Sequence, residues 1–125
     1  MTALVTVVVL SGFTNNKAPR QSITLEVTAM AYNSVNSQTK RGDPTLTAWG
    51  DKLKPGMKSI AVSHDLIKMG LGHNTKVKIE GLAGVYVVKD KMNKRWKKKI
   101  DIYMGQDVKA ARKWGRRKVT ITFTP

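Results

Sequence analysis

The stretch Val87–Asp101 reads Val-Val-Lys-Asp-Lys-Met-Asn-Lys-Arg-Trp-Lys-Lys-Lys-Ile-Asp, and it carries two aspartates eleven positions apart, one in each of two strand-like runs. In extended backbone Asp90 shares a side with Val88, and Asp101 shares a side with Tyr103. Acidic side chains are rarely fully buried without a partner, so two of them in strand-like runs need a reason. A pair of carboxyl groups near an apolar wall is what acid/base chemistry on a glycosidic bond requires. The stretch therefore predicts that Asp90 and Asp101 act together.

The composition limits both the size of the fold and the class of partner. The 125 residues suit one domain with one modest core. The 23 Lys and Arg residues against 8 Asp and Glu residues give a formal net charge of +15. This excess favours an anionic partner, which is a nucleic acid, an acidic membrane or an anionic wall polymer. The lack of cysteine excludes a disulfide framework and a cysteine metal site.

The N-terminal segment contains the apolar run Ala3–Leu10, which the small residues Ser11 and Gly12 close. The run is too short to span a bilayer, and its length suits the core of a signal peptide. We therefore expect residues 1–22 to form a signal-like segment and linker, and residues 23–125 to form the exported domain. The alternative is that the run is a buried strand of the domain.

Short alternating runs recur along the chain between turn residues, and they predict strands. The predicted strands are Ile23–Thr28, Ser59–Val62, Thr75–Glu80, Val85–Lys89, Ile100–Met104 and Lys118–Thr124. The segment Ala31–Asp43 is rich in Asn, Ser and Thr and predicts a surface loop. Asp107–Trp114 predicts a helix that ends at Gly115, and Asp65–Met69 predicts a single helical turn. The fold class is mainly β, a small six-stranded barrel with one short C-terminal helix.

Seven short motifs follow one another in an order that resembles a known domain. They are Met30-Ala-Tyr32, Thr47-Ala-Trp-Gly50, Ile60-Ala-Val-Ser63, Val77-Lys-Ile-Glu-Gly81, Val87-Val-Lys-Asp90, Ile100-Asp101-Ile-Tyr103 and Ala111-Arg-Lys-Trp-Gly-Arg-Arg-Lys-Val119. Together they resemble the 3D domain, named for three aspartates, which occurs in bacterial cell-wall proteins and in the catalytic barrel of the membrane-bound lytic transglycosylase A type. The resemblance implies a double-psi-like β-barrel that cleaves peptidoglycan glycan strands without hydrolysis.

The resemblance also implies the roles of the carboxylates. Asp90 and Asp101 match the second and third aspartates of the family, whereas Ser63 stands in place of the first and Asp65 lies two residues later. It implies that Asp101 is the acid/base and that Asp90 assists electrostatically, with the two roles exchangeable. Such an acid protonates the oxygen of the MurNAc–GlcNAc bond and then, as a carboxylate, takes the proton of the C6 hydroxyl that attacks C1. The pKa of the acid must then rise from about 3.9 to roughly 6. The alternative is that both aspartates make buried hydrogen bonds or ion pairs.

A substrate groove is implied by the same resemblance. Its predicted substrate-binding residues are Tyr32, Thr47, Trp49, Gly50, Ser63 and Asp65. An aromatic ring can stack on a sugar, and a glycine lets the backbone approach the glycan closely. Trp49 is equally suited to core packing, and Ser63 can donate to a sugar hydroxyl or to its neighbouring carboxylate.

A basic patch surrounds Trp96. It consists of Lys94, Arg95, Lys97, Lys98 and Lys99. These side chains suit a solvated loop, contacts with carboxylates of peptide stems or phosphates of wall polymers, or phosphate contacts and base stacking with a nucleic acid. His64 and His73 lack the spacing of a metal pair, so we expect neither a metal nor another cofactor.

We therefore expect an exported bacterial protein, periplasmic or extracellular and associated with the cell wall. Its expected partners are peptidoglycan glycan strands and anionic wall polymers, and its expected activity is lytic transglycosylation. One alternative is a wall-binding module of the same fold without catalysis, because Ser63 replaces an aspartate. The other is a small basic nucleic-acid-binding protein, which the net charge favours but the motif order does not. The sequence indicates no stable membrane anchor, and it names no protein partner.

Overall fold

The computed structural model describes residues 20–35 and 43–125. The apolar run Ala3–Leu10, which predicts a signal peptide, lies outside the described residues. Most of the predicted loop Ala31–Asp43 also lies outside them. None of the helices within the described ranges is long and apolar enough to cross a membrane.

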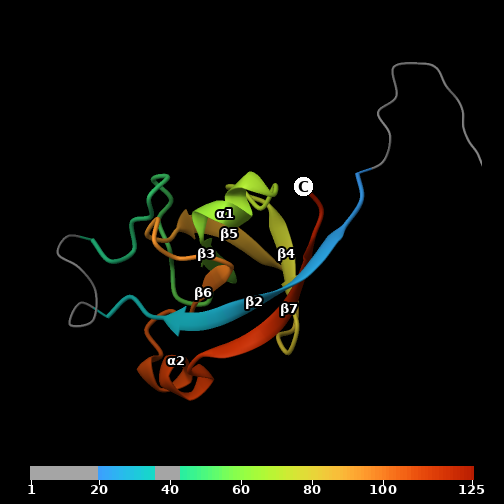
Figure 1. Cartoon of the computed structure of the whole chain (residues 1–125). Coiled ribbons are helices and arrows are strands. Elements are labelled where there is room, and N and C mark those ends of the chain that lie inside the picture. Colours follow the sequence, from blue (N-terminus) through green and yellow to red (C-terminus); the bar gives the residue numbers. More distant parts are fainter. Residues whose placement is uncertain (1–19, 36–42) are drawn as a thin grey trace, which may run out of the picture.

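Six strands form a closed barrel, as the alternating runs predict (Figure 1). The strands are β2 (Ile23–Tyr32), β3 (Ser59–Val62), β4 (Lys76–Ile79), β5 (Tyr86–Lys91), β6 (Lys99–Tyr103) and β7 (Arg117–Phe123). Around the barrel their order is β2-β6-β3-β5-β4-β7. Besides the predicted C-terminal helix α2 (Val108–Trp114), the described residues form the short helix α1 (His64–Lys68), where the sequence predicts a single turn.

Two parallel strand pairs interleave around the barrel. β2 runs parallel to β6, and β3 runs parallel to β5, while the other neighbouring pairs are antiparallel. Parallel strands need crossover connections rather than hairpins, so the chain crosses the barrel ends between β2 and β6 and between β3 and β5. This interleaved topology agrees with the double-psi-like barrel that we expect.

The core lies inside the barrel, where alternate side chains of every strand meet. Twelve strand residues supply most of it: Val27, Ala29, Ile60, Val62, Val77, Ile79, Val88, Ile100, Ile102, Val119, Ile121 and Phe123. Each large aliphatic side chain that is fully buried here stabilises the fold by roughly 1.5–3 kcal/mol. Side chains between these positions point outward, so the outer face of the barrel is available for a site.

β2 extends beyond its predicted end at Thr28, and the prediction of a loop from Ala31 was wrong at its start. Ala31 pairs with Ile102 and Tyr32 pairs with Tyr103 on β6. The side chain of Ala29 is fully buried in the core. Pairing and packing outweigh the low strand propensity of alanine. The extension carries Tyr32 to the end of the barrel beside β6.

Helix α2 has the ends that its sequence predicts. The side chain of Asp107 accepts a hydrogen bond from Ala110 N at 2.9 Å, and Gly115 follows the helix with a φ of 67°. Trp114 packs into the core, and its indole Nε1 donates to Ala29 O at 3.2 Å. Val108 and Ala111, the other residues of the predicted apolar stripe, line an open groove instead.

Candidate functional site

Asp90 and Asp101 lie in one row across three neighbouring strands. Ala61 on β3 is the register partner of Asp101 on β6 and of Asp90 on β5. Ile60 and Val62 on either side of Ala61 are in the core, so this row points to the outer face. The two carboxylates therefore stand two strand spacings apart, about 10 Å between backbones. The small Ala61 between them leaves room for a ligand.

An irregularity in β5 turns Asp90 outward. The register between β3 and β5 pairs Ile60 with Val88 but Ala61 with Asp90, so it skips Lys89. Simple alternation places Asp90 on the same side as Val88, and Val88 is fully buried in the core. The prediction that Asp90 shares a side with Val88 was wrong. An extra residue in one strand reverses the side of the sheet on which every following residue lies.

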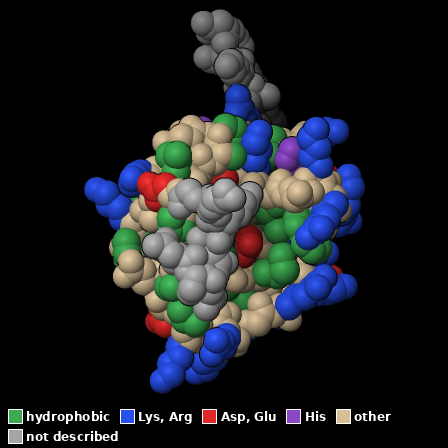
Figure 2. Space-filling model, turned by 90° about the vertical axis from the view of Figure 1, so that its left-hand side faces the viewer, with side chains coloured by type: hydrophobic (Ala, Val, Ile, Leu, Met, Phe, Trp, Pro, Cys, Tyr) green, Lys and Arg blue, Asp and Glu red, His purple; other side chains and the backbone are tan. Residues whose placement is uncertain are grey.

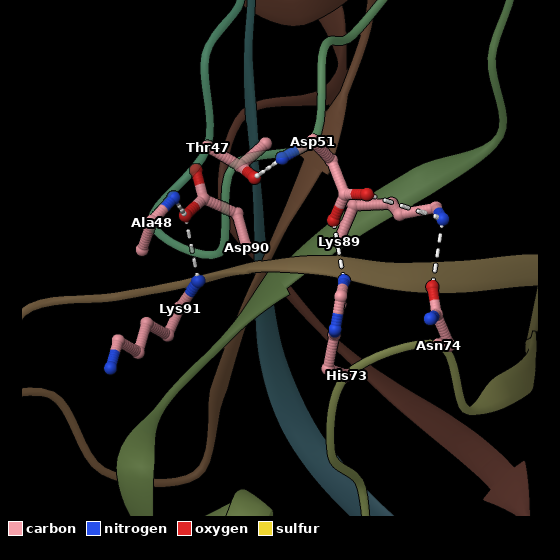
Figure 3. Close-up of polar contacts among 8 residues, drawn as sticks. All are labelled: Thr47, Ala48, Asp51, His73, Asn74, Lys89, Asp90 and Lys91. Carbon is pink, nitrogen blue, oxygen red and sulfur yellow. Dashed lines mark hydrogen bonds and ion pairs between the residues drawn. The ribbon is translucent and has the colours of Figure 1, made fainter.

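The carboxylate of Asp90 is held by backbone amides. Its Oδ1 accepts hydrogen bonds from Ala48 N and from Lys91 N, both at 2.9 Å. The first amide belongs to the turn Thr47–Asp51, in which the Thr47 hydroxyl accepts from Asp51 N at 3.0 Å (Figure 3). The turn thus fixes Asp90 from outside the barrel.

A polar cluster anchors the far end of this turn. The Asp51 carboxylate contacts His73 Nε2 and lies 3.7 Å from Lys89 Nζ (Figure 3). Lys89 also donates to Asn74 Oδ1 at 2.7 Å. Lys89 is the residue that the strand register skips, so the irregularity in β5 both turns Asp90 outward and ties the turn to the barrel.

Asp101 has the opposite environment. Its Oδ1 is buried and finds no hydrogen-bond partner among the described residues. Burial, and then the negative charge of Asp90, raise the pKa of Asp101 from 3.8 to about 7. Asp101 therefore exchanges its proton near neutral pH, which is the property of a general acid/base.

Two tyrosines flank Asp101 on the outer face. The rings of Tyr32 and Tyr103 lie with their centroids 5.4 Å apart. The Tyr103 hydroxyl shares a hydrogen bond of 2.9 Å with Ser34 Oγ. The Tyr32 hydroxyl is buried and has no partner in the described part of the chain. Burial, and then Asp90 and Asp101, raise the pKa of the Tyr32 phenol, so it stays protonated.

Tyr32, Asp90 and Asp101 line a groove of about 1020 Å³ on the outer face. Its wall combines acidic, aromatic and basic side chains: Asp43, Asp90, Asp101, Tyr32, Trp96, Lys91 and Arg112. Figure 2 shows an acidic side chain beside hydrophobic ones on the face turned to the viewer, with lysine and arginine side chains around it. A groove of this kind can hold an extended neutral chain at its centre and anionic groups at its margins.

The structure separates the six predicted substrate-binding residues into two sets. Tyr32 and Thr47 line the groove. Trp49 and Gly50 belong to the turn beside it but not to its lining. The ring of Trp49 stacks on His73 with 4.7 Å between centroids and lies under Lys91 Nζ at 5.6 Å. Trp49 is therefore engaged by protein groups rather than presented to the groove.

Ser63 and Asp65 also lie away from the groove lining. Ser63 is buried, donates to Asp65 Oδ1 at 2.6 Å and accepts from Lys99 N at 3.1 Å. Asp65 Oδ2 accepts from Lys98 N at 2.9 Å. Ser63 and Asp65 therefore anchor the end of the basic loop to α1. The bond from Ser63 to Asp65 is the hydrogen bond to a neighbouring carboxylate that the sequence allows for Ser63.

The basic patch forms the loop between β5 and β6. Lys94, Arg95, Lys97 and Lys98 are exposed, and Lys99 begins β6. Trp96 lies in the groove lining, with Arg95 and Lys99 over its ring at 4.8 and 5.2 Å from the centroid.

The sequence prediction of the groove missed Trp96, Ala61 and Arg112. The sequence does contain a signal for Trp96, since it is an aromatic residue among lysines. The placement of Ala61 and Arg112 in the groove depends on strand register and on the position of helix α2, which the sequence does not show. No group of three or more histidine, cysteine or acidic residues in the described ranges has the geometry of a metal site.

Comparison with known proteins gives a distant structural likeness. No family model matches the chain, and no curated protein matches it in sequence. A crystal structure of the apo expansin of Clavibacter michiganensis is 17% identical with a TM-score of 0.48. A point mutant of that expansin in complex with cellohexaose is 16% identical with a TM-score of 0.48. Both cover 82% of this chain, which spans half of the length of each.

Proposed function

We propose that the groove binds a glycan strand of the bacterial cell wall and that Asp101 cleaves it as the acid/base of a lytic transglycosylase. The observation that carries the proposal is the buried carboxyl of Asp101, whose pKa rises to about 7 beside Asp90 and whose Oδ1 has no partner within the described residues. The motif order that resembles the 3D domain supports the same substrate and a location outside the cytoplasm.

The proposed reaction needs one protonated carboxyl and no water as nucleophile. Asp101 donates its proton to the oxygen of the MurNAc–GlcNAc bond as the bond from C1 to that oxygen breaks. The C6 hydroxyl of the same MurNAc then attacks C1, and the Asp101 carboxylate takes the proton that it loses. The products are a 1,6-anhydro-MurNAc end and a GlcNAc end with a free O4 hydroxyl. Asp101 leaves the cycle protonated, as it began.

Asp90 has an electrostatic role in this reaction. Its negative charge raises the pKa of Asp101. The same charge stabilises the positive charge that develops at C1 in an oxocarbenium-like transition state. The amides of Ala48 and Lys91 hold its Oδ1 in place, so the charge needs no reorganisation during the reaction. Asp90 therefore acts as a fixed negative charge, whereas Asp101 transfers the proton.

A second candidate is a module that binds the glycan without cleaving it. Ser63 stands where the resemblance places the first aspartate, and its hydroxyl is already committed to Asp65 and to Lys99 N. The further acidic residue of the groove, Asp43, is paired with Lys52 at 2.7 Å. These contacts favour a site with two working carboxylates rather than three.

Mass spectrometry of purified peptidoglycan sacculi separates the two candidates. We expect the wild-type protein to release 1,6-anhydromuropeptides and the Asp101→Asn variant to release at least about 100-fold less, because the proton donor is lost. Glu26→Gln is the matched control, since Glu26 is an exposed acid on the outside of β2. If neither protein releases anhydro products and both sediment with sacculi, the binding module is the correct function. If neither sediments, both candidates fail.

A further inference from the structure

Two buried polar atoms without a partner face the same groove. They are the Tyr32 hydroxyl and Asp101 Oδ1, and both residues line it. The third such atom in the described chain, Ser59 Oγ, belongs to a residue outside the groove lining. Buried polar groups in folded proteins are nearly always hydrogen-bonded, so an unpartnered pair at a groove indicates a place where a ligand or water completes the bonds.

The strand register brings the two side chains together. β2 and β6 are parallel, with Met30 opposite Asp101 and Tyr32 opposite Tyr103. Tyr32 and Asp101 are therefore diagonal neighbours on the same outer face, a separation of roughly 7–8 Å that an aromatic side chain spans. The ring of Tyr103 packs against the Tyr32 ring and supports it.

The chemistry of the pair fits one kind of ligand group. A protonated phenol donates one hydrogen bond, and a carboxylate accepts one. A sugar hydroxyl accepts the first and donates the second at a single oxygen. An ammonium group can donate to both oxygens but leaves the phenol proton without an acceptor, and a phosphate or carboxylate of the ligand is repelled by Asp90 and Asp101. The pair is therefore suited to an uncharged hydroxyl.

We propose that the Tyr32 hydroxyl and Asp101 together bind the O4 oxygen of the GlcNAc residue at the cleavage point. This inference rests on the proposed function and names the atom that its site recognises. During cleavage Asp101 gives its proton to O4, and the Tyr32 hydroxyl donates to the same oxygen while negative charge builds up on it. Before Asp101 takes up the C6 proton, its carboxylate accepts from the new O4 hydroxyl, which still accepts from Tyr32. Tyr32 thus touches the leaving group and is a catalytic residue.

The test uses the disaccharide GlcNAc–MurNAc, which has a free O4 hydroxyl and lacks the MurNAc–GlcNAc bond that the reaction breaks. Calorimetry should show that Tyr32→Phe weakens its binding about tenfold, the effect of one lost hydrogen bond in a buried site. The 4-deoxy disaccharide should bind wild-type protein about as weakly as the Tyr32→Phe variant binds the parent sugar. The loss of binding free energy in the double variant Asp101→Asn, Tyr32→Phe should be clearly smaller than the sum of the two single losses, because both groups act on one oxygen.

Tyr103→Phe is the matched control, since it removes the same atom from a hydroxyl that is already bonded. We expect Tyr103→Phe to lower the unfolding midpoint by a few degrees and to leave disaccharide binding unchanged. Tyr32→Phe should leave the unfolding midpoint unchanged or higher, because its hydroxyl has no partner to lose.

The outcomes separate this inference from the proposed function. If the variants behave as expected but sacculi yield no anhydro products, the O4 site stands and the catalytic function fails. If sacculi yield anhydro products but Tyr32→Phe binds the disaccharide as wild type does, the function stands and the O4 site is wrong. If the disaccharide does not bind and no products form, both are wrong. Additive effects of Tyr32→Phe and Asp101→Asn also contradict a shared oxygen.

Discussion

Asp101 combines two conditions that normally exclude each other, a buried carboxyl and an open groove beside it. Burial disfavours its charged form, and Asp90 adds repulsion, while Ala61 between them fills little of the intervening space. The amides that satisfy Asp90 have no counterpart at Asp101 Oδ1 in the described chain. Asp90 Oδ1 is thus already bonded, whereas Asp101 Oδ1 remains open to a ligand at the groove.

The first prediction concerns the pH dependence of stability. The pKa of Asp101 rises from 3.8 to about 7, so between these values the folded chain holds a proton that the unfolded chain has released. The stability from this protonation is fully present below about pH 4 and is lost as pH rises through 7. At about 1.36 kcal/mol per pKa unit, the loss reaches about 4 kcal/mol. Asp101→Asn should therefore be more stable than wild type at pH 8 and equal to it at pH 4, as urea unfolding would show.

Asp90→Asn provides the second arm of this experiment. Asparagine keeps an Oδ1 that accepts from Ala48 N and Lys91 N but removes the charge, so the pKa of Asp101 should fall. The pH dependence of stability should then move to lower pH. A wild-type stability that is constant from pH 4 to pH 8 would contradict the burial of Asp101.

At the scale of elements, the turn Thr47–Asp51 and the irregularity in β5 work as a unit. The irregularity turns Asp90 outward and frees Lys89 to contact Asp51, and the turn returns the Ala48 amide to Asp90. Neither element holds Asp90 alone. The geometry of this carboxylate therefore depends on hydrogen bonds within the turn.

The second prediction removes one of these bonds. Thr47 is buried, and its Oγ1 accepts from Asp51 N. We expect Thr47→Val to lower the free energy of unfolding by about 1–3 kcal/mol, because it leaves that amide without its acceptor. Thr24→Val is the control, since Thr24 is exposed and its hydroxyl only meets that of Thr122. Equal losses for both variants, measured by urea unfolding, would show that the turn needs no side-chain support.

The third prediction concerns helix α2, which supplies Val108, Ala111 and Arg112 to the groove. Asp107→Ala removes the side chain that accepts from Ala110 N, which should cost about 1 kcal/mol of stability. Lys109→Ala in the same helix changes an exposed side chain and should alter stability by less than about 0.5 kcal/mol. Thermal unfolding of the two variants measures the difference. A loss for Lys109→Ala as large as that for Asp107→Ala would contradict the cap.

At the scale of the whole molecule, a strongly basic surface surrounds an acidic groove. The net charge is +15, yet three acidic residues line the groove against two lysine or arginine residues. The net charge therefore favours long-range attraction of an anionic polymer, whereas the groove itself suits an uncharged segment. The proposed ligand, a glycan strand with anionic peptide stems, meets both conditions.

The fourth prediction separates these two contributions by salt. Sedimentation of the protein with sacculi should decrease as salt rises from 0.1 to 1 M, where the screening length falls from about 10 to about 3 Å. A Lys94→Gln, Lys97→Gln variant of the exposed basic loop should bind more weakly at low salt and with a smaller salt dependence. The double variant should bind a short uncharged GlcNAc oligosaccharide as wild type does. Tighter binding of duplex DNA than of sacculi at matched salt would favour the nucleic-acid alternative.

The amino-acid sequence by itself determined the class of the fold and the ends of α2, and it singled out Asp90 and Asp101 as the two candidate site carboxylates. These depend on local patterns, since alternation, caps and turn residues act within a few positions. Only the tertiary structure decided that Asp90 faces outward, that Ala61 separates the carboxylates, and that Trp96 rather than Trp49 lines the groove. Strand register and the extra residue in β5 depend on partners far away in the chain, and no local pattern encodes them.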